Sequence, residues 1–200
     1  LFDVAENIPG NECRVTYGIR KDGALTIHME YEADEKIKTH EMPEFGMLLR
    51  IPEQYDKVTY YGYGPEENYW DRRQGSRLGK FHFSVKENLS EYLAPQESGG
   101  RSGVREAVIE DENGYGLRIS AEEMDLSALP YTPHELENAR HLYELPDSEY
   151  TILRPSLHQM GVGGDDSWLS KPHPQYRMEQ PGKYEFTFTL KGGKKLETDK

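Results

Sequence analysis

The stretch "CRVTYGIRKDGALTIHMEY", residues 13–31, decides the fold class because apolar and polar residues alternate on both sides of one turn signal. That signal is Asp22-Gly23, a dipeptide typical of tight turns between antiparallel strands. Every second residue around it is apolar, a pattern that turns one face of each strand toward a core. These residues are Cys13, Val15, Tyr17 and Ile19 before the turn, and Leu25, Ile27, Met29 and Tyr31 after it. The stretch therefore predicts a β-hairpin with one buried face, in which Cys13 is a buried small side chain.

The same two-residue period recurs further along the chain. In "VREAVIEDENGYGLRIS", residues 104–120, two alternating runs flank Asn113-Gly114 and predict a second hairpin. In "KYEFTFTLK", residues 183–191, four large apolar side chains share one face of a predicted strand. A shorter strand is predicted over residues 57–61. Regularly spaced strands with turn signals between them are typical of an antiparallel sheet.

One helix is predicted at "YTPHELENARH", residues 131–141. Thr132 can cap its N-terminus, Pro133 suits the first helical position, and Glu135 completes a capping box. Strands, turns and one short helix predict an all-β fold, a large antiparallel β-sandwich. We expect residues 1–200 to form a single domain, because this length can bury one sizeable core.

The charge balance excludes several classes of partner. The chain carries 36 acidic and 24 basic residues, a formal net charge of −12. Nucleic acids and anionic membrane surfaces are bound through clustered Lys and Arg, so neither is an expected partner. No run approaches the length of a transmembrane helix, and "LFDVAENIPG", residues 1–10, does not resemble a signal peptide. A soluble protein of the cytoplasm or periplasm is expected.

Familiar catalytic motifs are incomplete here. "HELEN", residues 134–138, begins like a zinc-protease helix, but Asn138 stands where the second histidine is needed. "GVGG", residues 161–164, resembles part of a dinucleotide loop, yet Asp166 occupies the position of the next glycine. Asp165 and Asp166 alone are weak evidence for a metal. On these motifs we expect no metal site, while a carboxylate pair for glycoside hydrolysis stays open because acids occur throughout the chain.

The two tryptophans lie in loops rich in glycine, acids and amides. Trp70 belongs to the loop at 61–75, and Trp168 to the loop at 157–177. Flat rings beside hydrogen-bonding side chains are typical of sugar sites, where a C–H face stacks on the ring. The alternative is that both rings anchor loops onto the sandwich. For Trp168 the neighbouring glycines and acids disfavour burial of the ring.

Four long segments have an unusual residue order. They are "MPEFGMLLRIPEQYDKVTYYGYGPEENYWDR" (42–72), "YLAPQESGGRSGVR" (92–105), "SALPYTPHELENARHLYELP" (127–146) and "MGVGGDDSWLSKPHPQYRMEQPGKYEF" (160–186). Together, in order and spacing from about Met42 to Leu190, they resemble the C-terminal, small-chain domain of the β-galactosidases of glycoside hydrolase family 2. The resemblance implies a galactose mutarotase-like supersandwich. It also implies a fragment of a bacterial enzyme that hydrolyses terminal β-D-galactosides such as lactose.

The resemblance also divides the roles between this chain and the rest of such an enzyme. In the family, two catalytic glutamates and the Mg²⁺ and Na⁺ sites lie in a central barrel, which nothing in this chain resembles. Trp168 corresponds to the aromatic platform that contacts the sugar. The other residues of its loop would shape it or hold it by hydrogen bonds. They are Gly161, Gly163 and Gly164, and Asp165 and Asp166.

The chain is shorter than the family's whole C-terminal domain and lacks its first strands. We therefore expect an unpaired sheet edge or a bare apolar face where the missing part packs. The expected partners are the remaining domains of the parent chain, a galactoside, and a second copy joined across that edge.

Two alternative functions stay open. A mutarotase-like sugar epimerase needs a carboxylate base and a histidine acid that face one pocket. The residues available are His158, His173, Asp165 and Asp166, to which the resemblance assigns no such role. The other alternative is an autonomous carbohydrate-binding module.

Overall fold

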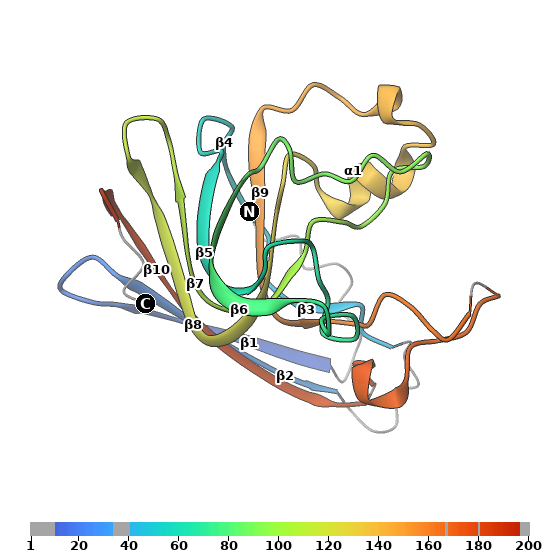
Figure 1. Ribbon diagram of the computed structural model, residues 1–200. Helices are drawn as coiled ribbons and strands as arrows, with labels where there is room; N and C mark the ends of the chain where they lie inside the picture. Colours follow the sequence, from blue (N-terminus) through green and yellow to red (C-terminus); the bar gives the residue numbers. More distant parts are fainter. Residues whose placement is uncertain (1–10, 34–40, 167, 180, 197–200) are drawn as a thin grey trace.

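The computed structural model describes residues 11–33, 41–166, 168–179 and 181–196. About half of these residues lie in antiparallel strands, which are joined by loops and one short α-helix (Figure 1). Residues 1–10, predicted not to be a signal peptide, lie outside the described part, as do residues 197–200 at the polar C-terminal end. The elements in chain order are β1 (Asn11–Ile19), β2 (Leu25–Ala33), β3 (Glu44–Gly46), β4 (Leu49–Pro52), β5 (Lys57–Gly64), β6 (Arg77–Ser84), β7 (Arg101–Glu110), β8 (Tyr115–Leu129), α1 (Pro133–Asn138), the 3-10 helix η1 (Leu142–Glu144), β9 (Tyr150–Gln159), the 3-10 helix η2 (Pro174–Tyr176) and β10 (Lys183–Lys194).

The long strand β8 joins the two layers of the sheet. Its first half pairs with β10, β7 runs along its other side, and its last five residues pair with β9. The main sheet has the order β1-β2-β10-β8-β7-β5-β6, and β9 carries β3 and β4. β3 and β9 lie against β10, so the smaller group of strands covers part of the main sheet (Figure 1). The predicted antiparallel β-sandwich is confirmed, and its layers are continuous through β8.

The core lies between these two layers. Tyr60 of β5 and Phe188 of β10 come from the main sheet, and Leu153 comes from β9. All three side chains are almost completely buried, as is Met124 in the middle of β8. Burial of such apolar area supplies most of the free energy that favours the folded state.

The strongest sequence predictions are confirmed. Residues 13–31 form the β1–β2 hairpin, residues 104–120 lie in β7 and β8, and residues 183–191 lie in β10. The helix α1 has the predicted capping box. The Glu135 amide donates to Thr132 Oγ1 at 3.2 Å, and the Thr132 amide donates to a Glu135 carboxylate oxygen at 2.7 Å.

The predicted loops are shorter than the sequence suggested, because strands extend into them. In the predicted loop 61–75, β5 continues to Gly64, and in the predicted loop 157–177, β9 continues to Gln159. The strands β3, β4, β6 and β9 were not predicted at all. In β9 the side chains from Thr151 to Ser156 are all buried, so this strand lacks the alternation that marks a half-exposed strand.

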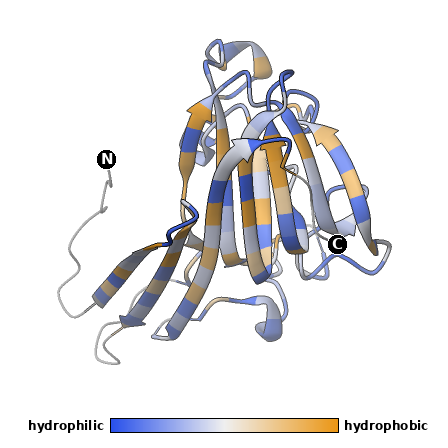
Figure 2. Ribbon diagram, turned by 90° about the vertical axis from the view of Figure 1, so that its left-hand side faces the viewer, coloured by the Kyte–Doolittle hydropathy of each residue, from blue (hydrophilic) through white to orange (hydrophobic). Residues whose placement is uncertain are grey.

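The prediction that Cys13 is buried is wrong: the side chain is exposed. β1 is an edge strand that pairs only with β2 among the described strands, and little covers its inner face. Tyr17 is 46% exposed and Ile19 is 83% exposed on the face that the alternation turns toward the core. Figure 2 shows the alternating hydropathy along this hairpin. We call Tyr17, Ile19 and the half-buried Leu25 the hairpin patch.

We predict that Ile19→Lys reduces the binding of an apolar fluorescent dye to this chain, because it places a charge in the hairpin patch. The free energy of unfolding should change by no more than about 0.5 kcal/mol, since Ile19 is exposed. Leu93→Lys is the matched control, because Leu93 is 95% exposed on a loop away from the patch. Equal dye binding by the two variants would contradict the prediction.

Candidate functional site

The loop that follows β9 carries the most exposed aromatic ring of the described chain. It projects away from both layers of the sheet, at the right of Figure 1. We call residues 160–170 the glycine loop; Ser167 lies outside the described residues. Trp168 is 87% exposed and Leu169 is 97% exposed. The predicted exposure of Trp168 is confirmed, and its contact with a sugar stays a prediction.

Hydrogen bonds within the glycine loop fix the backbone around Trp168. Asp166 Oδ1 accepts a hydrogen bond from the Trp168 amide at 2.7 Å. This bond, together with hydrogen bonds from Ser170, holds the pKa of Asp166 below its usual value. Gly164 packs so closely on the backbone of Ser170 that a Cβ there would clash with its carbonyl group. The expected roles of Asp166 and Gly164 in shaping the loop agree with this geometry.

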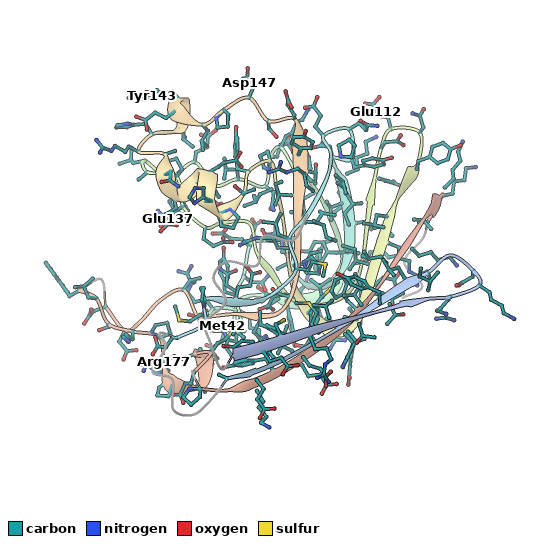
Figure 3. The ribbon with its side chains drawn as sticks, turned by 180° about the vertical axis from the view of Figure 1, so that it is seen from behind. Met42, Glu112, Glu137, Tyr143, Asp147 and Arg177 are labelled. Carbon is teal, nitrogen blue, oxygen red and sulfur yellow. The ribbon has the colours of Figure 1, made fainter. Side chains whose placement is uncertain are left out.

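The other acidic residue of the loop binds the chain segment that returns to the sheet. Asp165 Oδ1 lies 2.7 Å from His173 Nε2, just before η2. Both side chains are exposed. Arg177 holds the same segment, because its Nε donates to the Pro172 carbonyl at 2.7 Å. Figure 3 shows Arg177 beside Met42, at the opposite end of the molecule from Tyr143.

The base of the glycine loop contacts the loop between β5 and β6. Gly163 donates its amide to Asp71 Oδ2 at 3.2 Å, and Gly161 donates its amide to the Tyr176 carbonyl at 2.8 Å. A Cβ on Gly161 would lie 2.8 Å from Asp71 Oδ2 and 3.0 Å from Pro172 Cβ. Gly163 has nothing within 4 Å of the same position. Close packing therefore requires glycine at 161 and leaves room for a side chain at 163.

Trp70 packs inside the molecule. Its ring stacks on His158 at a centroid distance of 4.2 Å, with an angle of 17° between the ring planes. The edge of Tyr176 meets it at 5.6 Å and 72°. The side chain is half-buried, and its Nε1 is buried. Of the two candidate rings, Trp70 is thus an anchor for loops, and Trp168 is the exposed ring.

The residues available for epimerase chemistry are not gathered around one pocket. His158 lies against Trp70, and its Nδ1 is 3.5 Å from Asp125 Oδ2. His173 pairs with Asp165 on the exposed loop. No contact within the described ranges joins His158 to the loop carboxylates. His173 and Asp165 are thus the pair that the structure brings together, and the four residues do not line one common sugar pocket.

Buried polar residues that sequence reasoning missed link the loops to β9. Arg154 of β9 is 6% exposed and forms ion pairs with Glu44 of β3 and with Glu97 of the loop before β7. Burial raises the pKa of Glu97, and the neighbouring Arg154 opposes that change. Asp71 was missed as well, although it lies in the quoted "YGYGPEENYWDR" motif. Its contacts lie about ninety residues away in sequence, which no local pattern reports.

Two further classes of site can be assessed from the described residues. Within them, no group of three or more His, Cys, Asp and Glu side chains is arranged to hold a metal ion. No described helix is both long and apolar enough to cross a membrane.

The chain matches a family of known proteins over almost its whole length. The model of the family described as "Beta galactosidase small chain" matches residues 2–190. A β-galactosidase of Priestia megaterium is 44% identical over 180 residues, and one of Halalkalibacterium halodurans is 41% identical over 182 residues. Each match covers 90% of this chain but only 17% or 18% of the relative. The chain therefore spans about a sixth of the length of these relatives.

A similar solved structure is that of a galactose mutarotase related enzyme from Lactobacillus acidophilus. It is 10% identical, with a TM-score of 0.43, and the match covers 94% of this chain and 63% of that one.

We predict that Gly161→Ala lowers the free energy of unfolding by about 1–3 kcal/mol, because the new methyl group must displace Asp71 or Pro172. Gly163→Ala is the control, with an expected change within about 0.5 kcal/mol, since that position is open. Urea denaturation of the two variants measures both. Equal losses of stability would show that the close packing at Gly161 is unimportant.

We predict that the hydrogen bond from Trp168 to Asp166 weakens only in acid. The folded pKa of Asp166 lies below its usual value of 3.8, so the stabilisation is complete above that pH and is lost as the pH falls through the folded pKa. The Trp168 amide resonance, followed by NMR, should titrate with a midpoint below 3.8. Asp166→Asn should abolish the titration. A midpoint at or above the usual value would contradict the assignment.

Proposed function

The chain belongs to the β-galactosidase small-chain family, and from this premise we propose that it is the C-terminal β-sandwich portion of a larger family 2 β-galactosidase. The observation that carries the proposal is Trp168, which is 87% exposed on a loop anchored by hydrogen bonds at its base. An aromatic ring held in solvent in this way is suited to stack on a sugar.

The parent enzyme would hydrolyse terminal β-D-galactosides such as lactose with retention of configuration. Retaining glycosidases use one carboxyl group as acid and base and a second as nucleophile. We assign both glutamates, and the Mg²⁺ and Na⁺ of the active centre, to a barrel domain outside this chain. This chain would contribute binding, and by itself it would be inactive.

The role of Trp168 follows from the chemistry of galactose. The sugar has a face of C–H groups that packs against an aromatic ring, while its hydroxyl groups bind polar partners elsewhere. Trp168 would supply the ring and form one wall of the pocket. Asp166 holds the backbone at the ring, Gly161 allows the loop base to approach Asp71, and the Gly163 amide donates a hydrogen bond to Asp71. Asp165 would support the loop through His173.

The hairpin patch is where we place the contact with the rest of the parent chain. The relatives are about five times as long as this chain, so much of the parent remains to cover exposed surfaces. Tyr17 and Ile19 present apolar area next to the edge of β1 that pairs with no described strand, which favours the addition of further strands. A second copy of the parent could meet the same edge in a homo-oligomer. The net charge of −12 argues against nucleic acid as a partner.

We predict that Trp168→Ala in the full-length enzyme lowers kcat/KM for galactosides. The loss should correspond to about 1–3 kcal/mol of transition-state stabilisation, because one face of the sugar no longer stacks on an aromatic ring. Trp168→Phe keeps an aromatic ring and should therefore lose less of kcat/KM than Trp168→Ala. Leu93→Ala is the control, because Leu93 is equally exposed but lies on another loop. An unchanged kcat/KM across several galactosides would remove the platform assignment.

The 200-residue chain alone tests the division of roles. We expect it to release no galactose from a chromogenic galactoside and to show negligible galactose binding in calorimetry. Hydrolysis by the purified chain would overturn the proposal. Interconversion of α- and β-galactose would instead support the epimerase alternative, and strong binding without turnover would support a carbohydrate-binding module.

A further inference from the structure

We propose that Asp71 is the positioning residue that fixes the glycine loop, and with it Trp168, relative to the sheet. This inference rests on the proposed function, since its effect on catalysis requires that Trp168 contacts the sugar. Asp71 would not touch the substrate. It would act through the loop, by holding the two glycines at its base.

The contacts of the Asp71 carboxylate are the first part of the evidence. Its Oδ2 accepts a hydrogen bond from the Gly163 amide at 3.2 Å. The same oxygen lies 2.8 Å from the position that a Cβ of Gly161 would occupy. One carboxylate oxygen therefore binds the Gly163 amide and also packs closely against Gly161. The absence of a side chain at Gly161 is what lets the carboxylate come so close.

The neighbour of Asp71 in sequence is fixed to both ends of the loop. Trp70 stacks on His158, which lies in β9 just before the loop, and it meets Tyr176 of η2 just after the loop. The carbonyl group of Tyr176 also accepts the Gly161 amide at 2.8 Å. The contacts of Trp70 thus determine where the Asp71 backbone lies, and Asp71 then fixes the loop.

The two arginines that follow Asp71 in sequence contact other side chains. Arg73 is paired with Glu123 at 3.5 Å and lies over Tyr63, while Arg72 lies over the ring of Tyr69. The second carboxylate oxygen, Oδ1, is buried without a hydrogen-bond partner among the described residues. A buried carboxylate oxygen that accepts no hydrogen bond lowers the stability of the fold, so stability alone does not explain a carboxylate at this position. Its position is explained by the loop that it holds.

The outer half of the loop is rigid enough to transmit this position to Trp168. Asp166 binds the Trp168 amide, and Gly164 packs on the Ser170 backbone. These contacts tie Gly164 to Ser170 and Asp166 to Trp168, so we expect a change at the base to move the ring together with its neighbours. Loss of the Asp71 contact should then loosen the loop without unfolding the sheet.

The structural test uses NMR on the 200-residue chain and its Asp71→Ala and Asp71→Asn variants. In Asp71→Ala we expect faster hydrogen exchange of the Gly163 amide and a lower heteronuclear NOE of the Trp168 amide, with the sheet amides unchanged. Asp71→Asn keeps an oxygen acceptor and should restore most of both signals. Glu66→Ala is the matched control, because Glu66 is an exposed acid of the same loop. Unchanged Gly163 and Trp168 signals in Asp71→Ala would overturn the proposal.

The functional test uses the full-length enzyme. Asp71→Ala should raise KM roughly tenfold with little change in kcat, the pattern expected when a group that binds substrate and transition state equally is misplaced. Asp71→Asn should recover most of this loss. The double variant that combines Trp168→Ala with Asp71→Ala should have a KM no higher than that of Trp168→Ala alone. If Trp168→Ala lowers activity but Asp71→Ala does not, the positioning role is overturned. If Trp168→Ala has no effect, the proposed function fails, and the NMR result still decides whether Asp71 holds the loop.

Discussion

The whole architecture depends on one strand that belongs to both layers. β8 pairs with β10 and β7 along the main sheet and with β9 in its last residues. Its central side chains, including Met124 and Leu126, are buried because both layers close over them. The register of β7 against β8 shifts twice near Val104, and such irregularities bend a strand out of one layer and toward another. This bend determines where β9 lies, because β9 pairs with the end of β8. It therefore also determines where the glycine loop after β9 begins.

The fold could be predicted where strands are exposed on one face. Alternation marked β2 and β10, each of which has a more buried and a more exposed face, and it also marked β1, whose described residues are mostly exposed on both faces. It failed for β9, whose residues from Thr151 to Ser156 are buried on both faces, and for the short strands β3 and β4. It also misjudged Cys13, since alternation indicates which side chains share a face but not whether anything lies across that face. Burial depends on packing partners, which a local pattern does not contain.

The candidate site could likewise be predicted only in part. Glycines beside acids indicated that Trp168 would be exposed on a loop, because local composition determines how flexible and how polar a segment is. The residues that hold this loop could not be predicted. Asp71 and Trp70 come from a loop between β5 and β6, and their contacts with Gly163 and His158 depend on how β9 lies in the second layer. Loop composition suggested a sugar site at either tryptophan, and only the family resemblance singled out Trp168 in advance.

The exposed apolar groups of this chain share one physical explanation if it is part of a larger enzyme. Exposure of the Trp168 ring, and of the patch that contains Tyr17 and Ile19, to water is unfavourable. The free energy falls when another surface covers these groups. The patch is held by a paired strand and the ring by hydrogen bonds at the loop base, so both are ordered before the partner arrives. Order established in advance lowers the conformational entropy lost on binding. Under the proposed function, the hydrogen bonds of Asp71 and Asp166 with the loop backbone would therefore favour sugar binding without contact between either carboxylate and the sugar.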